Sequence, residues 1–274
     1  MEELVVQDIY IYPVKSLGGI SLQQAEVQQT GLQHDRRWML TDEKYKFLSL
    51  RTHPEMVFLQ TGFSSNSLLI THKKNFLPPL EIPLNASLKK EVTVTIWEDE
   101  CIAFEVSTPA NRWFSEILNM PVKLVYMPAT TQRHVDADFA EKGEIVSFAD
   151  AFPLMIIGQS SLDDLNSRLS CPLPMERFRP NIVFTGGAPY FEDIMSEFTI
   201  NGINFNVAKP CIRCVVTTID TVLATRGKEP LKTLSTYRSS KNKILFGQNL
   251  LHSGFGSIKV GDRLIVSELK KSAF

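Results

Sequence analysis

The alternation of apolar and polar positions predicts a chain built mainly from short strands. Seven segments in the first half are rich in β-branched and aromatic residues, and clusters of Gly, Pro, Asn or Asp separate them. The segments are Val5–Val14, Ala25–Gln29, Arg37–Thr41, Val57–Thr61, Leu68–Thr71, Val92–Trp97 and Ile102–Val106. Strands at this spacing predict a barrel or a strongly curved sheet.

A helix and a polar stretch follow these strands. Ser107 or Thr108 can cap the helix, and Pro109 suits its first turn. Its apolar positions recur at helical spacing: Trp113, Phe114, Ile117 and Leu118. Residues 127–144 are polar and interrupt the apolar pattern, so we expect a domain junction or an ordered surface loop there.

The second half predicts further strands and two short helices. The helices are expected at 159–169, with Ser160 or Ser161 as the cap, and at 229–238. The strands are expected at 152–157, 181–187, 198–208 (a hairpin turning near Asn201-Gly202), 215–220, 244–251 and 257–266. We therefore predict an α+β fold, mainly β, with at least one closed barrel, and domains that comprise residues 1–127 and 128–274.

Composition indicates an ordinary soluble globular protein. Of 274 residues, 43% are hydrophobic and 22% are charged. The 29 basic and 30 acidic residues give a net charge of -1, which offers no basic surface for a nucleic acid. The first residues lack the basic start and apolar core of a signal peptide, and no run reaches the roughly 18 apolar residues of a membrane helix. We therefore expect a cytoplasmic protein with reduced thiols and no membrane partner.

Cys211 and Cys214, two of the four cysteines, stand three residues apart in CIRCVVTTID. The pair could be a redox disulfide, half of a zinc site, one thiolate that binds a metal or acts as a nucleophile, or simply two buried thiols. A thioredoxin-type pair should open a helix, whereas VVTTID predicts a strand. A zinc site typically needs a second pair of ligands. Arg213 places a fixed positive charge beside Cys214, which favours a thiolate.

Basic residues stand at the ends of several predicted strands. Lys15-Ser16 ends the first strand, Arg36 precedes another, and Arg179 with Asn181 leads into the strand NIVF. Guanidinium forks, an ammonium group and neutral hydrogen-bonding groups together form a set that binds phosphate. Each residue taken singly could equally be a solvated surface charge. The sequence has no GxxxxGK[ST], so an ordinary nucleotide-binding P-loop does not explain the set.

Nine segments of the chain resemble a known family in order. They are YPVKS, DRRWML, VSFADAFPLMI, SSLDDLNSRL, FRPNIVFTG, CIRCVVTTID, EPLKTLSTYR, LFGQN and IKVGD. They resemble the signature segments of MOSC proteins with an N-terminal β-barrel domain, which are relatives of the mitochondrial amidoxime-reducing component and of bacterial reductases of N-hydroxylated compounds. The resemblance implies that residues 1–127 form the N-terminal MOSC β-barrel domain and that residues 128–274 form the MOSC domain.

The resemblance also implies roles for the candidate residues. In that family the second cysteine of CxRC coordinates molybdenum, which implies that Cys214 is the metal ligand and catalytic residue and that Cys211 is structural. A thiolate is a suitable ligand for a redox-active metal held mostly by sulfur. Arg213 matches an arginine that contacts the molybdenum cofactor. The residues that match the holders of its phosphate and pterin are Lys15, Ser16, Arg36, Arg179 and Asn181.

The function implied is an oxidoreductase that uses the molybdenum cofactor to reduce small N-hydroxylated substrates. The four cysteines lack an iron–sulfur spacing, so we expect electrons from a ferredoxin-, flavoprotein- or cytochrome-b5-like donor protein. Asp220 or His134 could assist proton delivery, but a structural role is expected for either. Ile212 stands where several relatives carry a polar residue. The alternative is a carrier of molybdenum cofactor or sulfur, related to the C-terminal domain of molybdenum cofactor sulfurases. The chain offers no pattern for a pyridoxal phosphate domain, so that cofactor is not expected.

Overall fold

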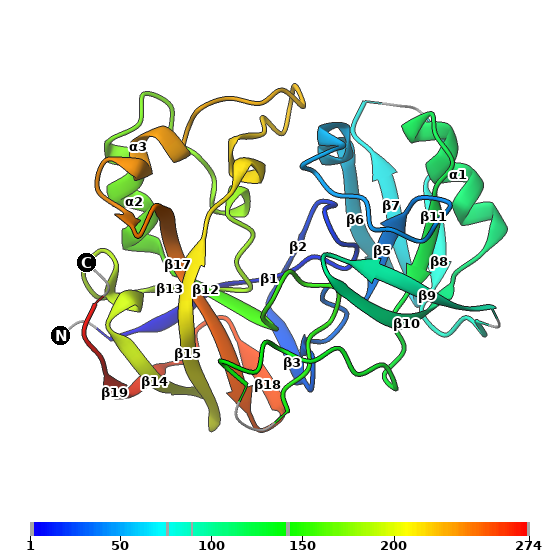
Figure 1. The fold of residues 1–274 in the computed structure, drawn as a ribbon. Coiled ribbons are helices and arrows are strands. Elements are labelled where there is room, and N and C mark those ends of the chain that lie inside the picture. Colours follow the sequence, from blue (N-terminus) through cyan, green and yellow to red (C-terminus); the bar gives the residue numbers. More distant parts are fainter. Residues whose placement is uncertain (1–2, 75–76, 89, 141–142, 273–274) are drawn as a thin grey trace.

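The computed structural model describes residues 3–74, 77–88, 90–140 and 143–272. Over these residues, nineteen strands accompany three α-helices and four short 3₁₀ helices. The elements form two lobes, one built round a nine-stranded sheet and the other round smaller sheets (Figure 1). The predicted class, α+β and mainly β, is confirmed.

The nine-stranded sheet forms the larger lobe. Its strands in spatial order are β19 (Leu264–Leu269), β14 (Met195–Ile200), β15 (Ile203–Ile212), β17 (Lys243–Ser253), β12 (Leu154–Gly158), β13 (Ile182–Thr185), β1 (Val5–Ile11) and β2 (Ile20–Leu22), and β16 (Ser239–Ser240) pairs with β17. Val5 forms a β-bridge with Arg263, and the backbone N–H of Val6 donates to the carbonyl of Asp262 at 2.8 Å. These contacts join β1, near one end of the strand order, to the start of β19 at the other end, so backbone pairing continues round the sheet.

The first strands of the chain belong to this larger lobe. β1 runs antiparallel to β13, and β3 (Gln24–Gln28) lies between β18 (Gly256–Lys259) and β4 (Gly31–Leu32). Their buried side chains share one hydrophobic core with strands near the C-terminus; this core includes Val6, Ile9, Val27, Phe198, Phe205 and Ile258. Strand pairing therefore brings residues 5–32 together with the second half of the chain.

The smaller lobe contains two antiparallel sheets and a helix. One sheet has the order β5 (Trp38–Thr41), β11 (Lys123–Tyr126), β10 (Asp99–Glu105) and β9 (Lys90–Ile96), and the other has the order β6 (Leu59–Ser64), β7 (Ser67–His72) and β8 (Leu80–Pro83). Helix α1 (Thr108–Leu118) starts at the predicted cap Ser107, whose side chain accepts a hydrogen bond from the backbone N–H of Ala110. It buries Phe114 and Leu118 against the sheets, as the helical spacing predicts.

The chain joins the two lobes just after Cys214. The 3₁₀ helix η4 (Val215–Thr218) follows β15 directly, and Ile219 is 1% exposed in the core of the smaller lobe beside Leu50. Arg226 also donates a hydrogen bond to the backbone carbonyl of Arg51. Packing against both lobes therefore fixes the backbone that carries Cys214.

Three predicted strands require correction. The single strand predicted at 257–266 is two strands, β18 and β19, which pair with β3 and β14 in different sheets. The strand predicted at 215–220 is wrong, because the hydroxyls of Thr217 and Thr218 donate to the carbonyls of Cys214 at 2.9 Å and Val215 at 2.8 Å and so close the turns of η4. The strand predicted from Val57 begins only at Leu59, because the 3₁₀ helix η1 (Pro54–Phe58) precedes it. Proline is favoured at such a helix start, since its φ is already close to helical.

The predicted cap of the next helix is also wrong. Helix α2 (Gln159–Ser167) begins after Gly158, which gives no side-chain cap. The hydroxyl of Ser161 instead donates to Glu192 at 2.8 Å and accepts from the backbone N–H of Tyr190 at 2.7 Å. The remaining helical elements are α3 (Leu231–Ser235), η2 (Met175–Arg177) and η3 (Phe191–Asp193).

The predicted hairpin at Asn201-Gly202 is confirmed by the pairing of Ile200 with Ile203. In the described part of the chain, none of the helices has the length and apolar character needed to cross a membrane.

Candidate functional site

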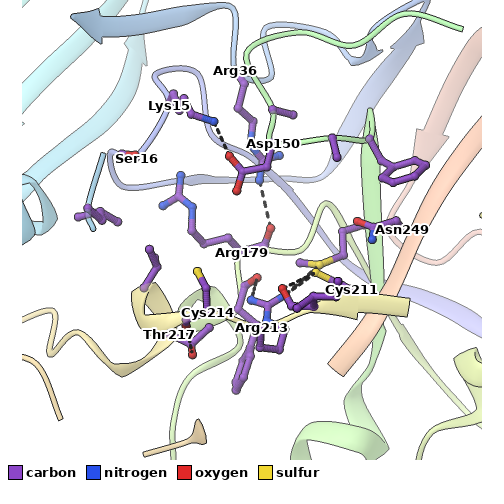
Figure 2. A pocket seen from close by; sticks show the side chains of 18 of the residues that line it. Lys15, Ser16, Arg36, Asp150, Arg179, Cys211, Arg213, Cys214, Thr217 and Asn249 are labelled. Atoms are coloured by element: carbon purple, nitrogen blue, oxygen red, sulfur yellow. Dashed lines mark hydrogen bonds and ion pairs between the residues drawn. The ribbon is translucent and has the colours of Figure 1, made fainter. Parts of the chain in front are cut away.

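A cavity of about 170 Å³ lies where the two lobes meet beside Cys214 (Figure 2). Segments that are far apart in the sequence line it. The lining includes every cofactor-site residue predicted from the sequence: Lys15, Ser16, Arg36, Arg179, Asn181, Arg213 and Cys214. The structure thus brings these residues together, while their roles toward a cofactor remain predictions.

Lys15 follows the end of β1 and is buried in the wall of the cavity. Its ammonium donates to the carboxylate of Asp150 at 2.5 Å and to the carbonyl of Phe148 at 2.7 Å. Burial lowers the pKa of Lys15, and the charge of Asp150 opposes that change. Desolvation raises the pKa of Asp150, but the Lys15 ammonium and its hydrogen bond outweigh it and hold the pKa below the usual range. The two groups therefore form an ion pair at the cavity.

Arg36 and Arg179 both stack on the aromatic ring of Tyr12. The Arg36 guanidinium carbon lies 4.4 Å from the ring centroid and the Arg179 carbon lies 4.1 Å from it. Burial and the charge of Arg36 lower the pKa of Arg179 to about 10, so the group stays protonated at neutral pH. The Tyr12 ring attracts both cations, which offsets part of their mutual repulsion.

Further hydrogen bonds fix the direction of Arg36. Its guanidinium donates to Asp35 at 2.5 Å, to the side-chain oxygen of Asn181 at 3.1 Å and to the carbonyl of Arg179 at 3.2 Å. The Asn181 amide donates in turn to the carbonyl of Tyr10 at 3.1 Å. Asn181 therefore holds Arg36 in place, and its predicted contact with a cofactor remains a prediction.

Three of the lining residues have left-handed backbone conformations. The φ angles are 71° at Ser16, 48° at Arg36 and 58° at Arg179. This region is uncommon for residues other than glycine, and such strained conformations gather at functional sites. The surrounding contacts hold three side chains of the cavity in directions that ordinary strand or helix backbone would not give.

Arg213 contacts Cys211 rather than Cys214. It donates to the carbonyl of Phe178 at 2.7 Å and to the sulfur atoms of Cys211 and Met155, each at 3.1 Å. Its Nε atom is buried and has no hydrogen-bond partner. The guanidinium therefore keeps one donor for a group that enters the cavity.

Cys214 lies between the end of β15 and the start of η4. Both the backbone N–H and the hydroxyl of Thr217 donate to its carbonyl, at 3.1 Å and 2.9 Å. Its thiol is free and half-buried, and Figure 2 shows the sulfur directed into the cavity below Arg179. Cys211 also lines the cavity, but its sulfur accepts a hydrogen bond from Arg213. The two cysteines of the CxxC spacing thus have different surroundings.

A second chamber of about 290 Å³ adjoins the first. Both chambers are lined by Ser16, Leu50, Arg177, Arg179 and Val216. The Tyr12 hydroxyl and the Arg177 Nε atom belong to residues that line this chamber, and both are buried without a hydrogen-bond partner. Buried donors without partners are costly, so the two chambers fit a ligand that is rich in acceptor atoms, as a phosphorylated pterin is.

The sequence pattern does not identify Tyr12, Asp150 or Arg177 as site residues. Tyr12 falls within a predicted strand, and only the folded structure shows that its ring contacts Arg36 and Arg179. Asp150 stands in the segment VSFADAF, where an acidic residue between apolar ones is the available signal. Among the described residues, His, Cys, Asp and Glu do not gather in groups of three or more that could hold a metal ion. The predicted coordination of molybdenum by the Cys214 thiolate alone does not require a cluster of three such residues.

Comparisons with known proteins match two domain models along the chain. Residues 3–121 match the model of the MOSC N-terminal beta barrel domain, and residues 143–265 match the model of the MOSC domain. Among solved structures, the YUAD protein from Bacillus subtilis aligns with 96% of this chain and 94% of its own chain, with a TM-score of 0.46 and 10% identity.

Two kinds of curated relatives are similar over most of this chain. "Mitochondrial amidoxime-reducing component 1" of Homo sapiens is 31% identical over 94% of this chain and 81% of its own length. "Molybdenum cofactor sulfurase" of Oryza sativa subsp. japonica is 30% identical over 90% of this chain but only 32% of its own length. The chain belongs to the family of MOSC proteins with an N-terminal MOSC β-barrel domain, which includes the mitochondrial amidoxime-reducing components.

Proposed function

We propose that this chain binds the molybdenum cofactor and reduces small N-hydroxylated substrates with electrons from a separate donor protein. The observation that carries the proposal is the gathering of Lys15, Arg36, Arg179 and Arg213 with the free thiol of Cys214 around one cavity. Asp150 and Asp35 pair with Lys15 and Arg36, so four cations face two carboxylates, and this positive excess favours an anionic ligand. The name of the human relative supports the substrate class, because an amidoxime is an N-hydroxylated compound.

The side chains fit the cofactor in distinct ways. Arg36 and Arg179 would bind its phosphate with charge-assisted hydrogen bonds, and Ser16 would add a neutral one. Arg213 has a buried Nε donor without a partner, which suits an acceptor atom of the pterin. The Cys214 thiolate would bind the metal. When bound, the cofactor would supply two-electron redox chemistry, which no side chain of the protein provides.

The overall reaction consumes two electrons and two protons, breaks the N–O bond and releases the reduced nitrogen compound and water. Lys15 and Asp150 form the ion pair at the cavity, and the Asp150 side chain is 65% exposed, so this pair is in contact with water. Asp220 accepts hydrogen bonds from the backbone N–H groups of Val222 and Leu223, which suits a role in the turn rather than in proton delivery. His134 lies in a β-bridge with residue 145.

The test is turnover of benzamidoxime by molybdenum-loaded protein with dithionite-reduced methyl viologen as the electron source. We expect benzamidine to form in the wild type and the Cys214→Ala variant to be inactive. Fully loaded wild-type protein that forms no benzamidine would contradict the reductase function and favour the second candidate.

The second candidate is a carrier of molybdenum cofactor or sulfur. It is favoured by the similarity to the rice protein named molybdenum cofactor sulfurase and by the free, half-buried thiol of Cys214. A carrier of sulfur would hold a persulfide on Cys214. Mass spectrometry would show this as the addition of one sulfur atom to wild-type protein, which cyanide removes and which the Cys214→Ala variant lacks.

A further inference from the structure

Exposed apolar side chains gather on the segment that carries Cys214. Nine large apolar side chains are exposed among the described residues, and four of them lie between positions 212 and 223. They are Ile212 (47% exposed), Val215 (45%), Val222 (66%) and Leu223 (63%). We call these four residues the 212–223 rim. Exposed apolar residues that gather in one place are typical of interaction sites.

Most of the rim is not part of the cavity lining. Ile212 contributes to the lining of the first chamber, whereas Val215, Val222 and Leu223 lie outside the linings of both chambers. A bridge between Ile219 and Arg226 closes the loop that carries Val222 and Leu223 at its tip. A small substrate inside the cavity would leave these side chains in water. A protein that covers the opening would bury them.

The surroundings of the rim are basic. Lys73 lines the second chamber together with Thr221, and Arg226 and Lys228 follow the loop and are exposed. Hydrogen bonds from the backbone of Leu223 and Val222 lower the pKa of Asp220, and the charges of Arg177 and Lys74 lower it further, so Lys74 also lies near the loop. Asp220 already accepts two backbone hydrogen bonds of the turn at 2.8 Å each. Around the rim the basic residues Lys73, Lys74, Arg177, Arg226 and Lys228 outnumber the acidic residues Glu176, Asp220 and Glu229, although the whole chain has a net charge of -1.

We propose that the 212–223 rim is the docking surface of the electron-donor protein, and that this donor presents an acidic face around its redox centre. The proposal rests on the proposed reductase function. Apolar contacts at the rim would provide affinity, and the basic residues around it would orient an acidic partner during encounter. Because Val215 directly follows Cys214, a protein that covers the rim places its redox centre beside the thiol that would bind the metal.

The experiment measures benzamidoxime reduction with three acidic carrier proteins, each kept reduced by its own reductase: a plant-type ferredoxin, a flavodoxin and a soluble cytochrome b5 domain. The test variants are Val222→Ser combined with Leu223→Ser, and separately Lys74→Glu. The control combines Ile265→Ser with Leu269→Ser, because these side chains are also exposed but lie on β19. Dithionite-reduced methyl viologen measures turnover without docking.

We expect at least one carrier to support turnover in the wild type. The double rim variant should raise the KM for that carrier by about tenfold, which is the size of effect that loss of central apolar contacts produces at interfaces. Lys74→Glu should raise the same KM and weaken its dependence on salt. The control variant should match the wild type, and turnover with viologen should be unchanged throughout.

Two results would overturn the docking proposal while leaving the reductase function intact. One is turnover with viologen but with none of the three carriers. The other is an equal KM for the carrier in the wild type and the double rim variant. Failure of turnover with viologen in loaded wild-type protein would instead contradict the reductase function itself.

Discussion

Tyr12 is the residue that holds the cationic wall of the cavity together. Its ring lies against the guanidinium groups of Arg36 and Arg179, and its side chain is only 1% exposed. Burial raises the pKa of the phenol above its usual value, so the hydroxyl is neutral, and it has no hydrogen-bond partner. The ring therefore contributes to the site through its face, and the buried hydroxyl without a partner does not stabilise the protein.

We predict that Tyr12→Leu destabilises the protein by on the order of 2–4 kcal/mol, because it removes two cation–π contacts and part of a packed core side chain. Tyr12→Phe keeps the ring and should change the free energy of unfolding by less than about 1 kcal/mol, since the lost hydroxyl has no partner. Urea unfolding of the two variants without cofactor measures both values. Equal destabilisation by Leu and Phe would show that the hydroxyl, not the ring face, is what matters.

The sequence indicates which basic residues gather at the cavity but not how they are held. Lys15, Arg36 and Arg179 can be identified because charged residues at strand ends are unusual and match family segments. The contacts of Tyr12 with Arg36 and Arg179 join positions that are far apart in the chain, and the three left-handed φ angles follow from those tertiary contacts. No local pattern encodes either feature, because each depends on how the two lobes come together.

At the scale of elements, the 3₁₀ helix η3 carries a buried acid far from the cavity. Glu192 is fully buried and accepts hydrogen bonds from the backbone N–H of Gly158 at 3.2 Å and from the Ser161 hydroxyl at 2.8 Å. Burial raises the pKa of Glu192 to about 7, and the charge of Asp193 adds to the increase. The hydrogen bonds favour the carboxylate, but burial outweighs them, so the buried acid protonates near neutral pH.

We predict that Glu192 makes stability depend on pH. Its folded pKa of about 7 lies above the unfolded value of 4.5, so its contribution is fully present below pH 4.5 and is lost as the pH rises through 7. The wild type should lose on the order of 2 kcal/mol of unfolding free energy between about pH 5 and about pH 8 through this group. Glu192→Gln cannot titrate and should remove that part of the slope in urea unfolding at a series of pH values. An unchanged slope in the variant would show that another group causes it.

The elements themselves were predictable wherever one local pattern decides them. Helix α1 has both its cap Ser107 and its apolar stripe in the sequence, and the hairpin turn at Asn201-Gly202 is equally local. Residues 215–220 carry β-branched side chains that predict a strand, yet the Thr217 and Thr218 hydroxyls bond to carbonyls three residues back and Ile219 packs into the other lobe. There the tertiary contact decides the structure, and β propensity does not.

At the scale of the whole molecule, the source of electrons is the property to test. The sequence has no GxGxxG after a strand, and its cysteines lack an iron–sulfur spacing. We predict that the purified, molybdenum-loaded chain does not reduce benzamidoxime with NADPH alone but does so with dithionite-reduced methyl viologen. Anaerobic assays of benzamidine formation with each reductant decide this. Turnover with NADPH alone would reveal an electron relay within the chain.

The most direct test of the central claim is the molybdenum content of three proteins purified from the same cofactor-competent host. We predict that the wild type retains molybdenum, that Cys214→Ala loses it, and that Cys211→Ala largely keeps it. Both cysteines line the cavity, but the Cys214 sulfur is directed into it, whereas the Cys211 sulfur accepts a hydrogen bond from Arg213, which is also held by the carbonyl of Phe178. Equal loss of molybdenum from both variants would contradict a single-thiolate site, and full retention by Cys214→Ala would contradict the role of Cys214 altogether.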